Sequence, residues 1–498
     1  MLLRNFRGAL CGLLFCIPLT ATNAQTIRYV NDDAQGANTG TSWTDAYTDL
    51  QSALTAAQSG DQIWVAAGRY VGNFTLALGV QVYGGFAGTE NELTQRDWKI
   101  NETILDGNQT GSVVTSPPGA TATTRIDGFT ITNGSGTVSG LYAYGGGVYL
   151  NNSSPTIANN MITGNSASYG GGGLYLWNSS ATITNNAITG NSAYYDGGGL
   201  FLWDSSPMMA NNTIAGNSTY WEGGGLYLDS SSPTIANTII AFNSSGVCQN
   251  SGTGIPTLQY NCVYGNGIYN YSHLTDPTGT DGNISADPML VRNPSDGGDG
   301  WGDDPATPDV DEGANDDFGD LRMRAGSPAI NAGDPGFVPQ PGETDLDGHA
   351  RVLCGRVDMG AYEFGIGDYD CDQSVDMADF AAWDTCMGGP SGAELRMANG
   401  EERMTLLENR NGSPSPQPSP LKGEGVGPRR GFDDPGQERM TGDGRSAIGM
   451  EDLRFENGPG APGSALRFDN PCAAFDFDAD GDTDLRDFAG FQRVFAGQ

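Results

Sequence analysis

A run of three glycines followed by three apolar residues occurs four times in the sequence, at a constant interval of 26 residues. The four copies begin at Gly145, Gly171, Gly197 and Gly223. Asparagine keeps the same interval at Asn165, Asn191, Asn217 and Asn243. A fixed period in this range is typical of a solenoid, in which each repeat is one coil and buries its apolar edge against its neighbours.

The content of the repeat indicates which kind of solenoid it forms. Each unit has three short runs of strand-forming residues, which in the first unit are 148–150, 156–157 and 161–163, separated by Gly, Asn, Ser and Pro. No unit contains the ten or more residues at helical spacing that a helical repeat requires. A coil of 26 extended residues has a contour of about 85 Å at about 3.3 Å per residue. We therefore predict an all-β fold, a three-sided parallel β-helix whose coils stack about 4.8 Å apart.

The period also assigns each side chain to a ladder that runs from coil to coil. The inward ladders are Val148/Leu174/Leu200/Leu226, Leu150/Leu176/Leu202/Leu228 and Ile157/Ile183/Met209/Ile235. The residue between two inward positions of one strand points outward, which predicts an outward-facing aromatic ladder of Tyr149, Tyr175, Phe201 and Tyr227. A corner ladder of Asn159, Asn185, Asn211 and Asn237 suits the left-handed backbone conformation and coil-to-coil hydrogen bonds.

The Gly-Gly-Gly-Leu and Asn-x-Ile-x-Gly-Asn patterns resemble the repeats of secreted bacterial right-handed parallel β-helix proteins, including polymorphic outer-membrane and adhesin-like passengers. Segments 42–50, 60–68 and 326–364 are similar to the N-terminal and closing parts of such proteins. The resemblance covers about residues 27–364 and implies a right-handed coil with a pectin-lyase-like fold. Within the N-terminal part, Asp45 is expected to cap a helix over 46–57 that covers the first coil.

The remaining sequence indicates the domain boundaries and the cellular location of the protein. Residues 1–24 have the two arginines, short apolar run and small-residue end of a secretory signal peptide, which predicts a secreted, extracellular or cell-surface protein. We assign 25–125 to the N-terminal cap and first coils, 126–290 to the repeat coils, and 291–365 to an acidic loop and the closing segment. No later segment is apolar enough to span a membrane. The net charge of −35 argues against nucleic acid as a partner and favours a divalent cation.

Six cysteines follow the predicted signal peptide, and sequence alone does not fix their pairing. Proximity favours a Cys248–Cys262 disulfide, and spacing favours Cys386–Cys472. Free buried cysteines are the alternative. Because no short Cys/His motif occurs, we expect no zinc site.

Two acidic motifs in residues 366–390 and 470–498 have the spacing of a calcium loop, with carboxylates at positions 1, 3, 5, 9 and 12 and a backbone carbonyl at position 7. The candidate ligands are Asp368, Asp370, Asp372, Ser374, Asp376 and Asp379 in the first loop and Asp476, Asp478, Asp480, Asp482, Asp484 and Asp487 in the second. Five carboxylates in 12 residues repel one another unless a cation neutralises them. We therefore predict Ca²⁺ as a cofactor.

The pair of loops resembles a dockerin, a module with two EF-hand-like loop–helix motifs that docks into a cohesin. The resemblance implies a small α-helical module after the β-helix, with a cohesin-like or other cell-surface protein as its partner. Residues 391–469 separate the two loops, contain the proline-rich run 413–420, and are predicted to be a disordered insertion or linker.

Two functions remain open for the β-helix. Trp177 and Trp203 share one offset in the repeat and could form a sugar-stacking platform, or they could simply cover apolar surface. Asp196 and Glu222 also share an offset and are weak candidates for a catalytic carboxylate pair. No Lys or Arg occurs between Ile126 and Val291, which disfavours a lyase that needs a cationic base. We predict a non-catalytic protein for binding or attachment at the cell surface or in the extracellular matrix, with calcium-dependent docking. The alternative is a polysaccharide hydrolase or lyase tethered through the dockerin-like module.

Overall fold

The computed structural model describes residues 25–250, 254–298, 300–301 and 315–365, and the backbone of 393–397 and 404–408. The described residues belong to two units, one containing 25–365 and the other containing the two short strands after residue 392. The predicted signal peptide, both calcium loops with all their candidate ligands, Cys386 and Cys472 lie outside the described residues. None of the helices in the described part of the chain has the length and apolarity required to cross a lipid bilayer.

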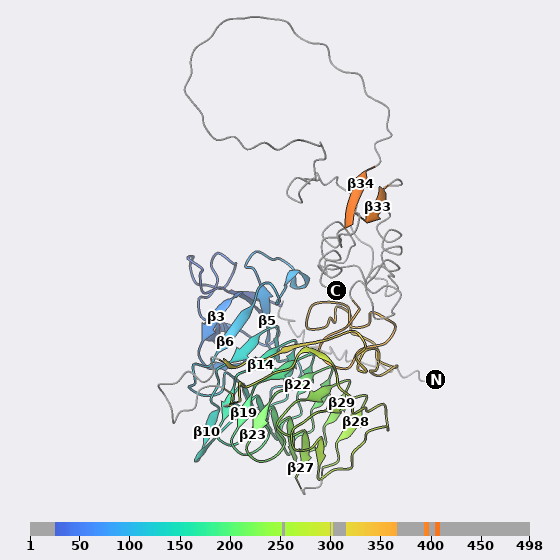
Figure 1. The fold of residues 1–498 in the computed structure, drawn as a ribbon. Coiled ribbons are helices and arrows are strands. Elements are labelled where there is room, and N and C mark those ends of the chain that lie inside the picture. The colour runs from blue at the N-terminus through green and yellow to red at the C-terminus, as the bar shows by residue number, and fades with distance from the viewer. Residues whose placement is uncertain are drawn as a thin grey trace, which may run out of the picture. The chain divides into compact units, whose positions relative to one another are not determined.

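Residues 25–290 wind into a parallel β-helix with three long sheets, as predicted (Figure 1). Sheet A contains nine strands: β1 (Ile27–Val30), β2 (Gln62–Ala66), β5 (Gln81–Phe86), β8 (Arg125–Asp127), β13 (Thr156–Ala158), β17 (Thr182–Thr184), β21 (Met208–Ala210), β25 (Thr234–Ala236) and β28 (Thr257–Gln259). Sheet B contains eight: β3 (Gly68–Val71), β6 (Thr103–Asp106), β9 (Thr130–Thr132), β14 (Met161–Thr163), β18 (Ala187–Thr189), β22 (Thr213–Ala215), β26 (Ile239–Ala241) and β29 (Cys262–Tyr264). Sheet C also contains eight: β4 (Phe74–Thr75), β7 (Val114–Ser116), β12 (Val148–Asn151), β16 (Leu174–Trp177), β20 (Leu200–Trp203), β24 (Leu226–Asp229), β27 (Val247–Gln249) and β30 (Tyr271–Ser272).

Shorter elements decorate the coils. They are helix α1 (Leu50–Ala56), the 3-10 helix η1 (Leu93–Gln95), the hairpin β10 (Thr137–Ser139) and β11 (Tyr142–Tyr144), the small parallel sheet β15 (Ser166–Ala167), β19 (Ser192–Ala193) and β23 (Ser218–Thr219), and the pair β31 (Leu290–Arg292) and β32 (Asp320–Met323). The small sheet lies in the turns that lead from sheet B to sheet C, so the repeated coils have a short fourth strand that the sequence did not predict.

The predicted inward ladders are confirmed by the strand register. Leu174 pairs with Val148 on one side and with Leu200 on the other, and Leu226 continues the ladder. The side chains of this ladder and of the Ile157 ladder are buried in one continuous apolar core. Because the interval is constant, each apolar side chain stacks on its equivalent in the next coil and excludes water along the axis.

The aromatic ladder faces outward, as predicted, but it is largely covered. Tyr149, Tyr175, Phe201 and Tyr227 stack in order and point away from the inner core. However, Phe201 is only 2% exposed, because Tyr144 of β11 and Tyr169 of the neighbouring turn pack over the ladder. Sheet C therefore carries a second, aromatic core on its outer side.

Two kinds of asparagine ladder hold the corners. Asn159, Asn185, Asn211 and Asn237 have φ between 48° and 55°, which confirms their predicted left-handed conformation. Most coil-to-coil bonds, however, come from fully buried ladders beside them, which the sequence analysis did not single out. Their members are Asn160/Asn186/Asn212 and Asn165/Asn191/Asn217/Asn243/Asn266. In each of these ladders a side-chain oxygen accepts from the backbone N–H of the preceding coil, so no buried turn amide there lacks a partner.

The triple glycines are required by close approach as well as by turn geometry. The first glycine of each triplet has φ between 63° and 70°, a region that favours glycine. A Cβ at the second glycine of the second copy, Gly172, would lie 2.2 Å from the backbone oxygen of Ser192 in the next coil. Neither position accepts a side chain without moving the backbone.

Helix α1 covers the first coil, as predicted, but begins later than expected. Its N-cap is Asp49, whose side chain accepts from the Ser52 N–H at 2.7 Å. Asp45 instead accepts from the Ala37 N–H in the preceding loop. The helix buries Leu50 and Leu54 against the core, which protects the open edge of the β-helix.

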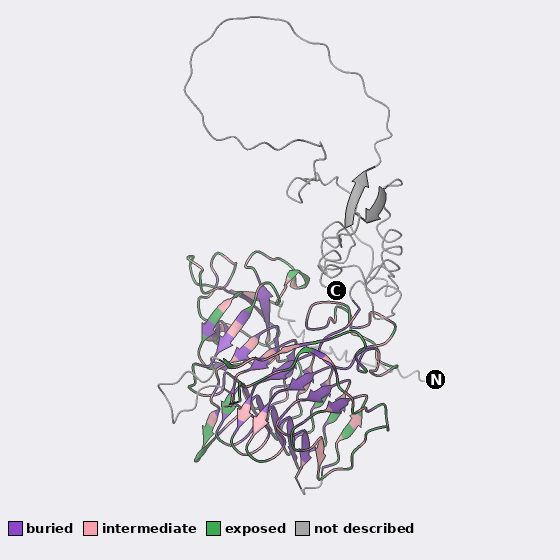
Figure 2. Ribbon diagram, viewed as in Figure 1, coloured by how far each residue is buried: buried purple, intermediate pink, exposed green. Residues whose placement is uncertain are grey.

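The segment after residue 284 runs back along the outer side of sheet B instead of covering the last coil. Leu290, Leu321, Ile330 and Met359 pack there against alanine and isoleucine side chains of β18, β22 and β26. Figure 1 shows the yellow part of this segment beside β14 and β22, and Figure 2 shows those strands largely buried. The contact reaches the N-terminal coils, because the Trp98 indole N–H donates to the carbonyl of Leu346 at 2.7 Å.

The predicted Cys248–Cys262 disulfide is wrong. Both residues are free and buried. Cys248 lies on the outer side of sheet C, next to Tyr227, whereas Cys262 lies on sheet B under the returning segment. Although the two cysteines are close in sequence, they lie on different sheets of the β-helix. Cys354, for which no pairing was predicted, is disulfide-bonded.

The second unit is described only as an antiparallel pair, β33 (Ala393–Met397) and β34 (Met404–Glu408). This pair lies at the start of the segment predicted to be disordered. The remainder of that segment lies outside the described residues.

Buried acids in the returning segment predict a pH effect on stability. Burial raises the pKa of Asp358 to about 7, and burial also holds the pKa of Glu363 well above its usual value, although Arg351 pairs with Glu363 at 3.1 Å. Above the ordinary carboxyl pKa of about 4 the folded state binds more protons than the unfolded state, so stability falls as the pH rises from about 4 to about 7. Thermal unfolding at pH 5 and pH 7.5 should show a higher Tm at pH 5, and Asp358→Asn should reduce the difference. A Tm that does not change with pH would contradict this account.

Candidate functional site

Exposed and half-buried aromatic side chains gather over the outer side of sheet C and the adjoining turns. We call this the aromatic surface, and its members are Tyr142, Tyr169, Trp177, Tyr194, Tyr195, Trp203, Tyr220 and Trp221. Their rings form one contact network that also includes the buried Phe201. Large exposed apolar patches of this kind are typical of binding sites.

The strand register creates the first aromatic stack. Trp177 and Trp203 end β16 and β20 at the same register position, and their ring centroids are 5.9 Å apart with an interplanar angle of 27°. Trp177 is 41% exposed and Trp203 is half-buried against Phe201. The structure therefore brings together the two tryptophans that the sequence proposed as a platform.

The turns from sheet B to sheet C create the second and third stacks. Each turn places two consecutive aromatic residues after β19 and β23, so that Tyr194 stacks on Tyr220 at 5.7 Å and Tyr195 packs on Trp221 at 6.2 Å. Trp221 is 57% exposed. These residues were not predicted from the sequence, although they share the 26-residue interval that revealed Trp177 and Trp203.

Three carboxyl groups border the aromatic surface. Asp196 and Glu222 lie on adjacent coils and form a parallel β-bridge, which confirms that their backbones are neighbours. The pKa of Asp196 is raised to about 6, mainly by burial and also by the negative charges of Glu222 and Asp229, while the hydrogen bond from the Glu222 N–H acts in the opposite direction. Because no Lys or Arg occurs between Ile126 and Val291, nothing in this stretch of sequence compensates the acids.

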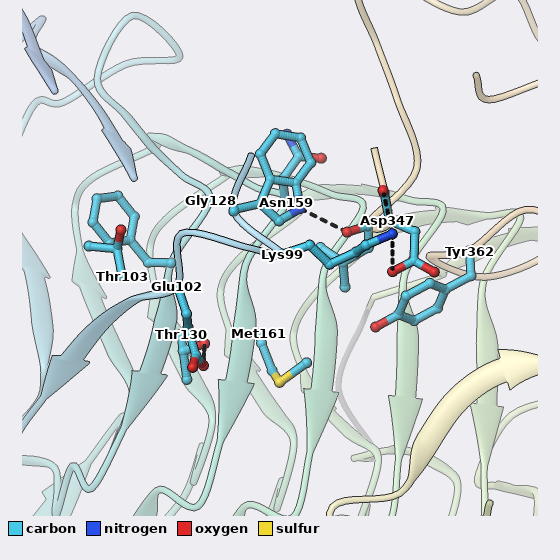
Figure 3. Close-up of a pocket in the computed structure, with 12 residues that line it drawn as sticks. Lys99, Glu102, Thr103, Gly128, Thr130, Asn159, Met161, Asp347 and Tyr362 are labelled. Carbon is cyan, nitrogen blue, oxygen red and sulfur yellow. Dashed lines mark hydrogen bonds and ion pairs between the residues drawn. The ribbon is translucent and has the colours of Figure 1, made fainter. Parts of the chain in front are cut away.

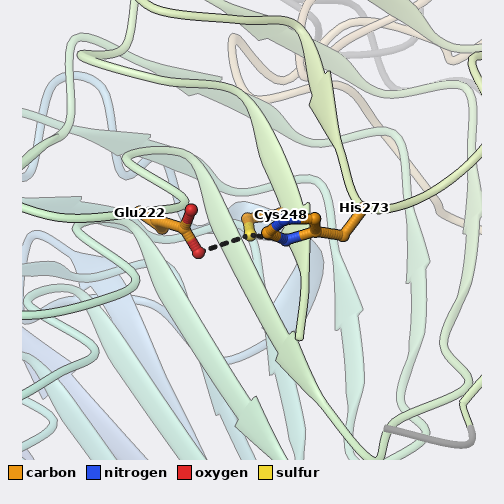
Figure 4. Close-up of side chains that lie close together, drawn as sticks. All are labelled: Glu222, Cys248 and His273. Carbon is orange, nitrogen blue, oxygen red and sulfur yellow. Dashed lines mark hydrogen bonds between the residues drawn. The ribbon is translucent and has the colours of Figure 1, made fainter. Parts of the chain in front are cut away.

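The side chain of Glu222 has a different partner. The Cys248 thiol donates to the Glu222 carboxylate at 3.2 Å, and the Cys248 sulfur lies 3.8 Å from Nδ1 of His273 (Figure 4). Burial and the hydrogen bond to Glu222 raise the pKa of the Cys248 thiol to about 12. This group was not predicted from the sequence, because its members are about one coil apart and do not form a short motif.

A separate hollow of about 180 Å³ lies where the returning segment meets the N-terminal coils (Figure 3). The Lys99 ammonium contacts Asp347, at 3.4 Å from its carbonyl and 3.9 Å from its carboxylate, and Thr130 donates to Glu102 at 2.9 Å. These polar groups are partnered within the protein. The hollow is therefore a gap at the contact between two packed segments, and we do not assign it a ligand.

The match to a protein-family model supports the fold. A family described as "Right handed beta helix region" matches residues 95–282, which indicates that the coil is right-handed. Among solved structures, pectate lyase Pel9A is 15% identical, with a TM-score of 0.36 over 68% of this chain and 96% of that chain. The pectin methylesterase from Aspergillus niger is also 15% identical, with a TM-score of 0.26 over 53% of this chain and 91% of that chain. No curated protein matches the sequence. Residues 95–282 thus form a right-handed parallel β-helix region.

Proposed function

We propose that this protein binds a neutral extracellular polysaccharide through the aromatic surface and acts in attachment without degrading its ligand. The observation that carries the proposal is the set of stacked, solvent-facing rings on neighbouring coils, above all Trp177 and Trp203. The negative face of an aromatic ring attracts the weakly positive C–H groups of a sugar face, and burial of both surfaces adds a hydrophobic contribution.

The scaffold favours an extended ligand. Equivalent rings recur along the axis with the coil spacing of about 4.8 Å, and their backbone is fixed by continuous parallel sheets. A preorganised surface loses little conformational entropy when it binds, so several weak stacking contacts can add up. The acids Asp196 and Asp229 can accept hydrogen bonds from sugar hydroxyls. Without Lys or Arg from Ile126 to Val291, the same surface repels polyanions, so we expect a neutral polymer.

Affinity electrophoresis against a panel of neutral polysaccharides and polyuronates tests this function. We expect retardation by a neutral polymer, and we expect the double change Trp177→Ala, Trp203→Ala to weaken binding at least about tenfold, or about 1.4 kcal/mol. Met208→Ala is the matched control, because Met208 is a 52% exposed apolar residue on sheet A. Equal losses in the control and the double variant would exclude the aromatic surface as the binding site.

The enzymatic alternative is tested in the same mixtures. A hydrolase would release new reducing ends and a lyase would release new unsaturated ends. The neighbouring positions of Asp196 and Glu222 make Asp196→Asn and Glu222→Gln the informative variants. If ends are released by the wild type and not by these variants, the protein is an enzyme, and the proposal of non-catalytic attachment fails.

The calcium loops complete the proposal, because an exported binding protein needs a connection to another component of the surface. We propose that they bind Ca²⁺ and dock the chain to a cohesin-like or other cell-surface protein. Calorimetric titration of the full chain should show Ca²⁺ uptake well below millimolar concentration, since oxygen ligands in this spacing suit Ca²⁺ better than Mg²⁺. Asp480→Ala should remove about half of the uptake. Asp204→Ala, outside the loops, is the control, and an equal loss in both would contradict the assignment.

A further inference from the structure

Glu222, Cys248 and His273 bring an oxygen, a sulfur and a nitrogen donor to one point beside the aromatic surface (Figure 4). The three ligand atoms all lie within 4.8 Å of one another. They come from three successive levels of the β-helix: the turn before β24, strand β27, and the residue after β30. We propose that these three side chains bind a zinc ion.

The distances already approach those of a zinc site. Donor atoms around one tetrahedral zinc lie about 3.3–3.6 Å apart, given Zn–S of about 2.3 Å and Zn–N or Zn–O of about 2.0–2.2 Å. The Cys248 sulfur is 3.2 Å from the Glu222 carboxylate and 3.8 Å from the His273 ring nitrogen. The third separation, between the Glu222 carboxylate and the His273 nitrogen, is within 4.8 Å. Side-chain rotations of Glu222 and of the exposed His273 that shorten this separation to about 3.4 Å would place all three atoms around one ion.

Charge and donor type favour zinc over the calcium proposed for the C-terminal loops. When zinc binds, the Cys248 thiol releases its proton to solvent, and the resulting thiolate and the Glu222 carboxylate together neutralise the divalent ion. The stretch from Ile126 to Val291 supplies no Lys or Arg to compete for them. Thiolate and imidazole are ligands for zinc and similar transition metals, whereas Ca²⁺ and Mg²⁺ prefer all-oxygen sites. Three protein ligands leave a fourth position, which is the arrangement of zinc sites that bind water or a substrate.

The position of Cys248 in its ladder and the exposure of His273 also favour a metal site. Cys248 continues the ladder in which the preceding coils place Tyr175, Phe201 and Tyr227, so the aromatic core ends where the donor set begins. His273 has φ of 58°, a left-handed conformation uncommon for residues other than glycine and asparagine. It is exposed and also lines an open hollow of about 730 Å³, so a metal ion in solution can reach the site.

A nucleophilic cysteine is the competing interpretation, and the geometry does not favour it. In a Cys–His pair the acid orients the histidine, which in turn contacts the sulfur. Here the carboxylate of Glu222 contacts the sulfur directly. The Glu222 carboxylate and the His273 nitrogen both approach the sulfur, which is the arrangement of a metal-ligand set and not of an acid–histidine–cysteine triad.

Cobalt titration of the full-length protein tests the proposal. Co²⁺ binds at zinc sites, and when a thiolate is a ligand it gives a thiolate-to-cobalt charge-transfer band in the near ultraviolet. With excess Ca²⁺ present to fill oxygen-rich sites, we expect this band in the wild type and its disappearance when Zn²⁺ is added. Cys248→Ser should abolish the band. His273→Ala, at an exposed position that leaves the core intact, should weaken Co²⁺ binding by about 100-fold, at least as much as loss of an outer-shell partner.

The matched control is Cys262→Ser, because Cys262 is also free and buried, and its thiol donates only to the Ala286 carbonyl at 3.1 Å. The control should keep the band and the affinity. Circular dichroism of each variant checks that the fold is retained. A wild-type protein without the band, or a band that survives both Cys248→Ser and His273→Ala, would overturn the proposal. The test uses no polysaccharide, so its outcome is independent of the proposed function.

Discussion

Replacing Asn191 with alanine is expected to lower the free energy of unfolding of the β-helix by about 3–5 kcal/mol. The Asn191 side chain is completely buried, and its oxygen accepts from the backbone N–H of Asn165 at 3.1 Å. Its amide donates to the carbonyls of Ile162 at 2.8 Å and Thr189 at 3.1 Å. Alanine would leave these backbone groups buried without partners, and each such group costs about 1–3 kcal/mol. Denaturant unfolding followed by tryptophan fluorescence measures the change.

Asn151→Ala provides the matched control for this prediction. Asn151 also belongs to a repeat coil, but it ends β12 at a half-exposed position where water can replace its hydrogen bond. We expect a loss below about 1 kcal/mol. If the two variants lose similar stability, the buried asparagine ladder is not what holds the coils together.

Replacing Phe201 with alanine should cost about 3–5 kcal/mol, although its side chain points away from the inner core. Phe201 packs edge-on against Tyr175 at 5.3 Å and Tyr227 at 4.9 Å and is covered by Tyr169. Its removal would open a cavity in the outer aromatic core. Thermal and denaturant unfolding of the variant measure the loss.

Trp177→Ala is the comparison, because Trp177 belongs to the same sheet face but is partly exposed. Less of its surface leaves water on folding, so we expect a loss of about 1 kcal/mol. A Phe201→Ala variant that is no less stable than Trp177→Ala would show that the outer layer is not a core.

The inner core could be predicted from the sequence because two periods determine it. The 26-residue interval fixes which residues stack, and the alternation within a strand fixes which of them face inward, as Leu174 and Leu200 illustrate. A displacement of one residue would place every leucine outside, so a sequence with this pattern has one favourable register.

The covering of the outer side could not be predicted, because it depends on how glycine-rich turns fold. Strand alternation correctly predicted that the Phe201 side chain points out of the coil, but it did not predict that other side chains cover this residue. Tyr144 belongs to the hairpin strand β11, which is not part of the repeat, and Tyr169 lies in a recurring turn whose path over the sheet the strand pattern does not determine. The returning segment is a similar case, since the contact between Trp98 and Leu346 joins residues 248 positions apart.

The cysteines show the same limit at the level of a site. Distance along the chain suggested Cys248 and Cys262 as partners, but a coil places them on different sheets. It places Cys248 next to Glu222 and His273, which are about one turn of the β-helix away. In a solenoid, neighbours are separated by the period, so short-motif rules for metal ligands overlook them.

Oxidative footprinting of the full-length protein with its polysaccharide bound tests the central claim most directly. Hydroxyl radicals modify exposed tryptophan and methionine side chains, and mass spectrometry measures each site separately. We predict that the ligand protects Trp177 and Trp221 and leaves Met208, on sheet A, as reactive as in the free protein. Protection of Met208 with unchanged reactivity of both tryptophans would contradict the claim that the aromatic surface binds the polysaccharide.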